Sequence, residues 1–181
     1  MRFSYYNRLS LSQRRIYDQS DRVSVLELRQ PERHHGRVLA LGRALESGKR
    51  TTTRKCAQEL LDGLTEAFGV SSLKVSVRER RPSSQTSELH GLYEADGGGP
   101  PRVSVWMRTA QRAQVVKFKT FLRTLIHELC HHLDYQRFRF KDSYHTEGFY
   151  KRESSLMRQL YREPQTGKSP ANELRSSADR V

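Results

Sequence analysis

The feature that most constrains the fold of this chain is a long apolar stripe between residues 115 and 136. Seven apolar side chains recur there mostly at intervals of three or four residues, which is the spacing of one face of an α-helix. They are Val115, Phe118, Leu122, Leu125, Ile126, Leu129 and Leu133. The pattern predicts one long helix over 115–136, and its apolar face needs a second layer of structure to cover it.

Shorter patterns on either side of this helix predict the remaining elements. Apolar residues at helical spacing predict a helix over 53–68, and alternation of polar and apolar residues predicts short strands. The strands are expected at 73–77, 89–93 and 102–107, and a last helix at 146–161. We therefore expect an α+β domain in which a small, mainly antiparallel sheet packs on helices, with the long helix at its centre.

The chain divides into three parts at residues 50 and 163. Residues 1–50 are basic and weakly patterned, with a short helix expected at 10–17 and a loop at 31–36. We treat them as an N-terminal extension that packs on the core or contacts a partner. Residues 51–163 hold the patterned domain, and residues 164–181 are polar without periodicity, which predicts a disordered tail.

The charge of the chain indicates a polyanionic partner. Lys and Arg number 33 against 20 Asp and Glu, which gives a formal net charge of +13. Nucleic acid is the first expectation for such a surface, and a merely solvated basic surface is the alternative. The start of the chain lacks a signal-peptide pattern, and no apolar run reaches the roughly 20 residues of a membrane span. We expect a cytoplasmic protein without a membrane partner, with association with the nucleoid as a further option.

Two cysteines, Cys56 and Cys130, form neither a C-x-x-C pair nor a disulfide framework. Reduced thiols in a cytosolic protein are the simpler interpretation. The cysteines therefore offer no metal site of their own.

Histidine, glutamate and histidine at positions 127, 128 and 131 match the H-E-x-x-H pattern. Residues four apart lie on one face of a helix, so His127 and His131 can reach the same ion on the side away from the apolar stripe. Glu128, one step round the helix, is placed to accept a proton from a water that a zinc ion activates. A chance match is the alternative, and the position of both histidines opposite the stripe favours a zinc site.

A catalytic zinc takes three protein ligands and keeps one position open. His145 stands 14 residues after His131, at the start of the last predicted helix, and is our expected third ligand. Glu153, further along that helix, is the rival, and Asp142 and Glu147 are the remaining alternatives.

Two neighbours of the motif are not expected to be ligands. Asp134 shares the face of the two histidines but lies about 10 Å along the axis from His127, too far to join them on one ion. We expect a solvated charge there, with a hydrogen bond to a ligand as the alternative. His132 points toward the apolar stripe and is expected to be a packed or capping side chain.

The sequence HELCHH at 127–132 and the run HTEGF at 145–149 resemble the SprT/Spartan-like metalloprotease family. That family pairs H-E-x-x-H with a later histidine, which an aromatic residue follows four positions on, as Phe149 does here. The resemblance covers about residues 53–162 and implies a zincin-like, SprT-like fold. Tyr144 and Thr146 differ from the glycines often seen beside the later histidine, and no cysteine follows Cys130 to form the zinc ribbon of many members.

By position, the resemblance implies zinc bound by His127, His131 and His145, with Glu128 as the catalytic residue. It also implies a DNA-associated role, because members degrade proteins crosslinked to DNA. The expected function is a zinc-dependent endopeptidase that acts on protein or peptide substrates, including DNA-bound proteins. The alternatives are a basic nucleic-acid-binding module with a structural or degenerate zinc site, and a zinc hydrolase of non-peptide amides.

Three further surfaces are candidates for substrate or DNA. The stretch RFRFK at 137–141 interleaves cations with aromatics, which suits single-stranded DNA, but we favour a loop that its phenylalanines anchor to the core. The predicted strand at 102–107 is a candidate edge for an extended peptide, and its Trp106 is expected to pack rather than to line a pocket. A basic rim is expected from Lys117, Lys119, Arg123, Lys151 and Arg152.

Overall fold

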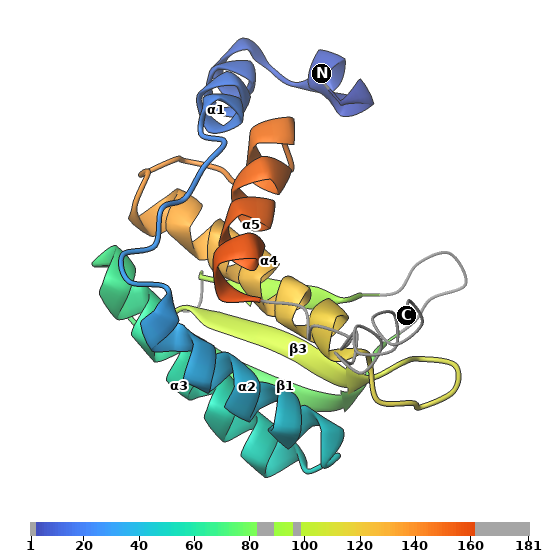
Figure 1. The fold of residues 1–181 in the computed structure, drawn as a ribbon. Helices are drawn as coiled ribbons and strands as arrows, with labels where there is room; N and C mark the ends of the chain where they lie inside the picture. The colour runs from blue at the N-terminus through green and yellow to red at the C-terminus, as the bar shows by residue number, and fades with distance from the viewer. Residues whose placement is uncertain (1–2, 83–88, 96–98, 162–181) are drawn as a thin grey trace, which may run out of the picture.

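The structure is a computed structural model that describes residues 3–82, 89–95 and 99–161. After a short 3-10 helix at Ser4–Arg8, the described residues form five α-helices and three strands (Figure 1). In chain order these are α1 Leu11–Arg22, α2 Glu32–Glu46, α3 Arg50–Phe68, β1 Lys74–Arg80, β2 Gly91–Glu94, β3 Arg102–Arg108, α4 Phe118–Gln136 and α5 Glu147–Leu160. The fold is therefore α+β, as predicted. Most of the polar stretch at 82–87, which we expect to be a loop, and the tail predicted at 164–181 lie outside the described residues.

The sheet has the order β1-β3-β2 and mixed direction. Strand β1 pairs with β3 in parallel, with Val75 opposite Val103, and β2 pairs with β3 antiparallel. The expectation of a mainly antiparallel sheet is wrong, because the strand next to β1 is β3 rather than its neighbour in sequence. The expected edge at 102–107 is wrong for the same reason: β3 is the central strand, and β2 is an edge.

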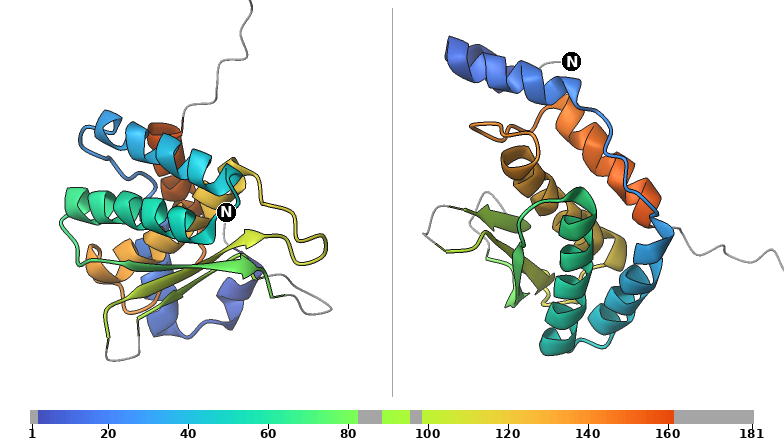
Figure 2. Two further views of the ribbon diagram at one scale, coloured as in Figure 1. Left: turned by 90° about the horizontal axis from the view of Figure 1, so that it is seen from below. Right: turned by 90° about the vertical axis from the view of Figure 1, so that its left-hand side faces the viewer.

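Helices α3 and α4 pack on the sheet, α3 against β1 and α4 against β2 and β3. Helix α2 lies on α3, and α5 on α4 and α1. Figure 2 shows α2 and α3 stacked over the sheet. Val103, Val105 and Met107 of β3 join the core cluster with the apolar side chains of α3, α4 and α5. The apolar stripe of α4 is therefore covered by the sheet and by the neighbouring helices.

Regular structure begins before residue 50. The expected loop at 31–36 is wrong, because α2 begins at Glu32 and its Val38, Leu41 and Leu45 are buried in the core. Those three side chains follow helical spacing, and burial against α3 outweighs the loop-like composition of the first turn. The expected short helix at 10–17 is confirmed by α1, which Ser10 caps by accepting a hydrogen bond from the Gln13 amide. Part of the N-terminal segment therefore packs on the core, and the domain boundary near residue 50 stays a prediction.

The long motif helix starts three residues later than predicted. Val115 pairs with Arg108 in an isolated bridge, and the Val116 amide donates to the Met107 carbonyl at 2.8 Å. The apolar stripe therefore continues backward from α4 into an extended segment. Among the described residues, no helix is long and apolar enough to cross a membrane.

Candidate metal centre

Three imidazoles, two from helix α4 and one from the loop before α5, converge on one point. The Nε2 atom of His145 lies 2.9 Å from Nε2 of His127 and 3.0 Å from Nε2 of His131. His127 and His131 are one turn apart on α4, and His145 directly precedes Thr146, the N-cap of α5. The structure thus brings together the three histidines expected from the sequence, and their ligand atoms all lie within 4.8 Å of one another.

A carboxylate orients the ring of His127 from behind. Glu153 of α5 places Oε2 at 2.9 Å from His127 Nδ1, and its Oε1 accepts from Arg123 at 2.6 Å. The Nδ1–H of His127 donates to this carboxylate, so the lone pair of the ring is on Nε2. Glu153, the rival ligand, therefore contacts the far side of the ring while His145 approaches Nε2.

A second hydrogen-bonded chain orients His131. The Ser143 hydroxyl donates to Asp134 Oδ2 at 2.6 Å, so its oxygen accepts from His131 Nδ1–H, 2.7 Å away. Arg152 in turn donates to both carboxylate oxygens of Asp134, at 2.6 and 2.8 Å. This chain fixes the same tautomer as in His127 and leaves the Nε2 lone pair of His131 free toward the centre.

Asp134 and Arg152 are therefore not surface charges. Both side chains are 0% exposed, so the expectation of a solvated Asp134 and the assignment of Arg152 to a basic rim are wrong. Burial raises the pKa of Asp134, and the Arg152 guanidinium and Ser143 hydroxyl oppose that shift. The two hydrogen bonds between these opposite charges offset part of the cost of burying them.

The Phe149 ring packs against all three imidazole rings. Its centroid lies 4.9 Å from that of His127, 4.8 Å from that of His131 and 5.1 Å from that of His145. The Arg152 guanidinium lies on this ring as well, 4.9 Å from its centroid. The aromatic residue four positions after His145 thus packs against all three imidazoles and against the buried cation beneath them.

The three imidazoles are held in a form suited to a cation. Burial, followed by the neighbouring histidines, lowers the pKa of His131 to about 3, and burial followed by His127 lowers the pKa of His145 to about 4. The rings of His131 and His145 are therefore neutral at pH 7. The Nε2 lone pairs of His127 and His131 both face Nε2 of His145, which lies within 3.0 Å of each. Nitrogen atoms this close repel one another unless a cation or a shared proton lies between them. Three imidazole nitrogen donors are a set that zinc takes in catalytic sites, so the residues fit that ion.

Glu128 follows His127 on α4, and its side chain is almost fully shielded from solvent. It is 5% exposed, and burial raises the pKa of its carboxyl to about 7, a shift that His127 partly opposes. Gly91 of β2 makes room for it, because a Cβ at position 91 would overlap Glu128 Oε1 and lie 2.8 Å from Thr124 Cγ2. A carboxyl with a pKa near neutrality is poised to exchange a proton at pH 7.

The other expected residues around the motif lie as follows. His132 is buried, and its ring bonds the Tyr93 hydroxyl at 3.1 Å and the Ser71 carbonyl at 2.9 Å, which confirms the packed role. Trp106 is 6% exposed, which confirms burial. In the 137–141 loop Phe138 packs against the core and stacks on Phe140 at 5.5 Å, as expected for an anchored loop.

The sequence analysis missed the part that α1 plays. Ser20 and Val23 accept hydrogen bonds from Arg152, and Asp21 Oδ1 accepts from the Gly148 amide at 2.8 Å. Ser and Asp are common at the ends of helices for several reasons, so Ser20 and Asp21 did not by themselves indicate contacts with Arg152 and Gly148. Helix α1 nevertheless contacts the elements that carry the third histidine and the buried cation.

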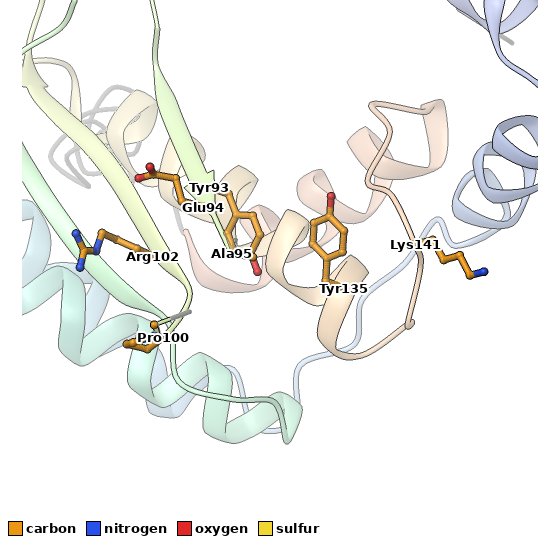
Figure 3. A pocket seen from close by; sticks show the side chains of 8 residues that line it. Tyr93, Glu94, Ala95, Pro100, Arg102, Tyr135 and Lys141 are labelled. Atoms are coloured by element: carbon orange, nitrogen blue, oxygen red, sulfur yellow. The ribbon is translucent and has the colours of Figure 1, made fainter. Parts of the chain in front are cut away.

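None of the three histidines lines the cavity of about 770 Å³ that the structure contains between β2, β3 and α4. Its walls include Tyr93 and Glu94 of β2, Tyr135 of α4, Arg102 of β3 and Lys141 (Figure 3). The Tyr93 and Tyr135 rings stack, with centroids 5.8 Å apart and planes 12° apart. Strand β2 runs from Gly91, beside Glu128, to this cavity, so the two sites lie along one strand.

We compared the chain with models of protein families, with curated protein sequences and with solved structures, and found no match in any of the three. The function is therefore argued from the site itself.

Proposed function

We propose that this protein is a zinc-dependent endopeptidase in which His127, His131 and His145 hold the metal and Glu128 is the general base. The observation that carries the proposal is the approach of His145 Nε2 to within 3.0 Å of Nε2 in both motif histidines. Zinc, when bound, supplies a Lewis acid that makes a water acidic enough to lose its proton at neutral pH.

Glu128 takes up that proton and later donates it to the leaving amine. Burial favours the protonated form of this carboxyl, and a zinc ion nearby would favour the charged form, so the two effects oppose each other at the proton that Glu128 takes up and releases. Glu153 and the Ser143–Asp134 pair keep the rings of His127 and His131 in one orientation throughout. A base fixed beside a preorganised cation site is what hydrolysis of a carbonyl compound requires.

Strand β2 is the proposed docking edge for the substrate backbone. It is an edge of the sheet, and its Gly91 lies against Glu128. An extended peptide that pairs with this edge passes the general base, and a side chain one or two positions on reaches the cavity lined by Tyr93 and Tyr135. This geometry favours a peptide over a small amide, because a small amide leaves the strand edge and the cavity unused.

The net charge of +13 favours a second candidate, a basic nucleic-acid-binding module whose zinc site is structural or degenerate. The two functions are compatible in an endopeptidase that works on DNA-bound proteins, single-stranded DNA being the favoured form. A structural site fills its coordination with protein ligands, whereas only three histidines gather among the described residues here. We therefore favour the peptidase.

The test is cleavage of an unfolded protein such as casein, with and without single-stranded DNA, by the parent and by Glu128→Gln. The expected result is loss of cleavage in the variant while it retains one equivalent of zinc. Glu59→Gln, an exposed change on α3, is the matched control and should cleave as the parent does. Equal cleavage by Glu128→Gln contradicts the catalytic role. Zinc and DNA binding without cleavage under any condition would instead support the binding module.

A further inference from the structure

A buried guanidinium joins the end of α1 to the motif helix. Arg152 donates from Nη1 to the carbonyl oxygens of Ser20 and Val23, at 3.0 and 3.1 Å, and from Nη2 to Ser20 Oγ at 3.0 Å. The same Nη2 donates to the Asp134 carboxylate. Since Arg152 is completely buried, its charge is satisfied only while α1 and Asp134 are both in place.

From Asp134 the hydrogen bonds continue to an imidazole of the site. Asp134 accepts from the Ser143 hydroxyl, which accepts from His131 Nδ1–H. A continuous path therefore runs from Ser20 on α1, through Arg152 on α5 and Asp134 on α4, to a ring whose Nε2 faces the metal position. The orientation of that ring depends on the far end of the path, because each link fixes the proton of the next.

A separate set of contacts ties the N-terminal segment to the start of α5. Asp21 Oδ1 accepts from the Gly148 amide at 2.8 Å, and a Cβ at position 148 would overlap the Asp21 backbone. The Tyr5 hydroxyl donates to the His145 carbonyl at 2.9 Å. Residues 5–23 thus contact the backbone that presents the third imidazole as well as the guanidinium that orients His131.

We propose that residues 5–23 are a positioning element of the metal centre, so that docking of α1 and binding of zinc stabilise each other. This inference rests on the proposed zinc site. When α1 is undocked, Arg152 loses three acceptors and is no longer fixed beside Asp134, the carboxylate that holds the Ser143 hydroxyl toward His131. The ring of His131 then samples other orientations, which weakens zinc binding. By thermodynamic linkage, zinc must then disfavour the undocked state by the same factor.

Hydrogen exchange of the α1 amides, measured with and without saturating zinc, tests this coupling. Zinc is expected to slow exchange across Leu11–Arg22 by roughly five-fold or more in the parent, the low end of typical coupling between sites. Ser143→Ala breaks the path next to His131 without touching α1, so zinc-dependent protection should largely disappear in that variant. Ser143→Thr keeps a hydroxyl and should keep the protection. Gln19→Ala, an exposed change on α1, should behave as the parent.

Zinc affinity gives the reciprocal measurement, by competition with a chromophoric chelator. Ser143→Ala is expected to weaken binding by about ten-fold or more. Ser20→Ala should weaken it several-fold and add little in the Ser143→Ala background, because both changes cut one path. Unchanged α1 exchange on zinc binding, or protection that persists in Ser143→Ala, overturns the positioning role and leaves the zinc site standing. A parent protein that binds no zinc overturns the proposed function and this inference together.

Discussion

Replacing Glu128 by Gln should stabilise the metal-free protein at alkaline pH. Burial raises the pKa of this carboxyl from 4.5 to about 7 in the folded state, so the folded protein disfavours the charged form. A group with a raised folded pKa contributes its full stability below the unfolded pKa, here 4.5, and loses it as the pH rises through about 7. At pH 8 the parent therefore carries the cost of a buried carboxylate that glutamine, which is neutral, does not.

The size of the effect follows from that shift. A pKa difference between 4.5 and about 7, at about 1.4 kcal/mol for each pKa unit, corresponds to about 3 kcal/mol at most. For a domain of this size the gain is a rise in Tm of roughly 6–12 °C at pH 8. At pH 4.5 both side chains are neutral in the folded state, and the difference in Tm should be small.

Thermal unfolding of chelator-treated protein, followed by circular dichroism at pH 4.5, 6, 7 and 8, measures this directly. The gain in Glu128→Gln should grow between pH 4.5 and 8, while Glu59→Gln, whose side chain is exposed, should follow the parent at every pH. A variant that is no more stable than the parent at pH 8, or equally stabilised at pH 4.5, refutes the reasoning that burial of Glu128 has a cost in folding.

Three other changes have defined outcomes. Gly91→Ala places a methyl group where Glu128 Oε1 lies, so proteolysis should fall by on the order of 100-fold or more while zinc stoichiometry is kept; unchanged kcat/KM contradicts this close approach. Removal of zinc by a chelator should lower stability by about 2.7 kcal/mol relative to protein with free zinc at 100 times its Kd, and the difference should vanish in His145→Ala; a zinc-dependent Tm in that variant argues against His145 as a ligand. Thr146→Ala removes the hydroxyl that accepts from the Phe149 amide at 2.9 Å and should cost about 1 kcal/mol in urea unfolding, and no loss would show that the cap is dispensable.

The sequence was most informative where one residue pattern determines one structure. The apolar stripe and the alternating valines predicted α4, β1 and β3 because helix and strand periodicities differ. The H-E-x-x-H spacing placed His127 and His131 on one face, and His145 was found because a chain reversal between two helices leaves few positions for a third donor. The start of α2 was missed because His34, His35 and Gly36 read as a loop, although the stripe further along that helix is regular.

Contacts between distant segments account for what the sequence did not show. Alternation assigns side chains to faces of a strand but does not say which strand is the neighbour, so the central position of β3 was not foreseen. That Asp134 lies too far along its helix to share an ion with His127 stays a prediction, and its carboxylate bonds to Arg152 and Ser143. Its burial depends on Arg152 from α5 and Ser143 from a loop, which no local pattern relates to it.

X-ray absorption at the zinc edge of the purified, zinc-loaded protein tests the central claim most directly. We predict one zinc per chain, with about three imidazole nitrogens and one further light atom near 2.0–2.1 Å, and a smaller imidazole signal in His145→Ala. A sulfur neighbour near 2.3 Å, four imidazoles, or a spectrum unchanged by His145→Ala would contradict it.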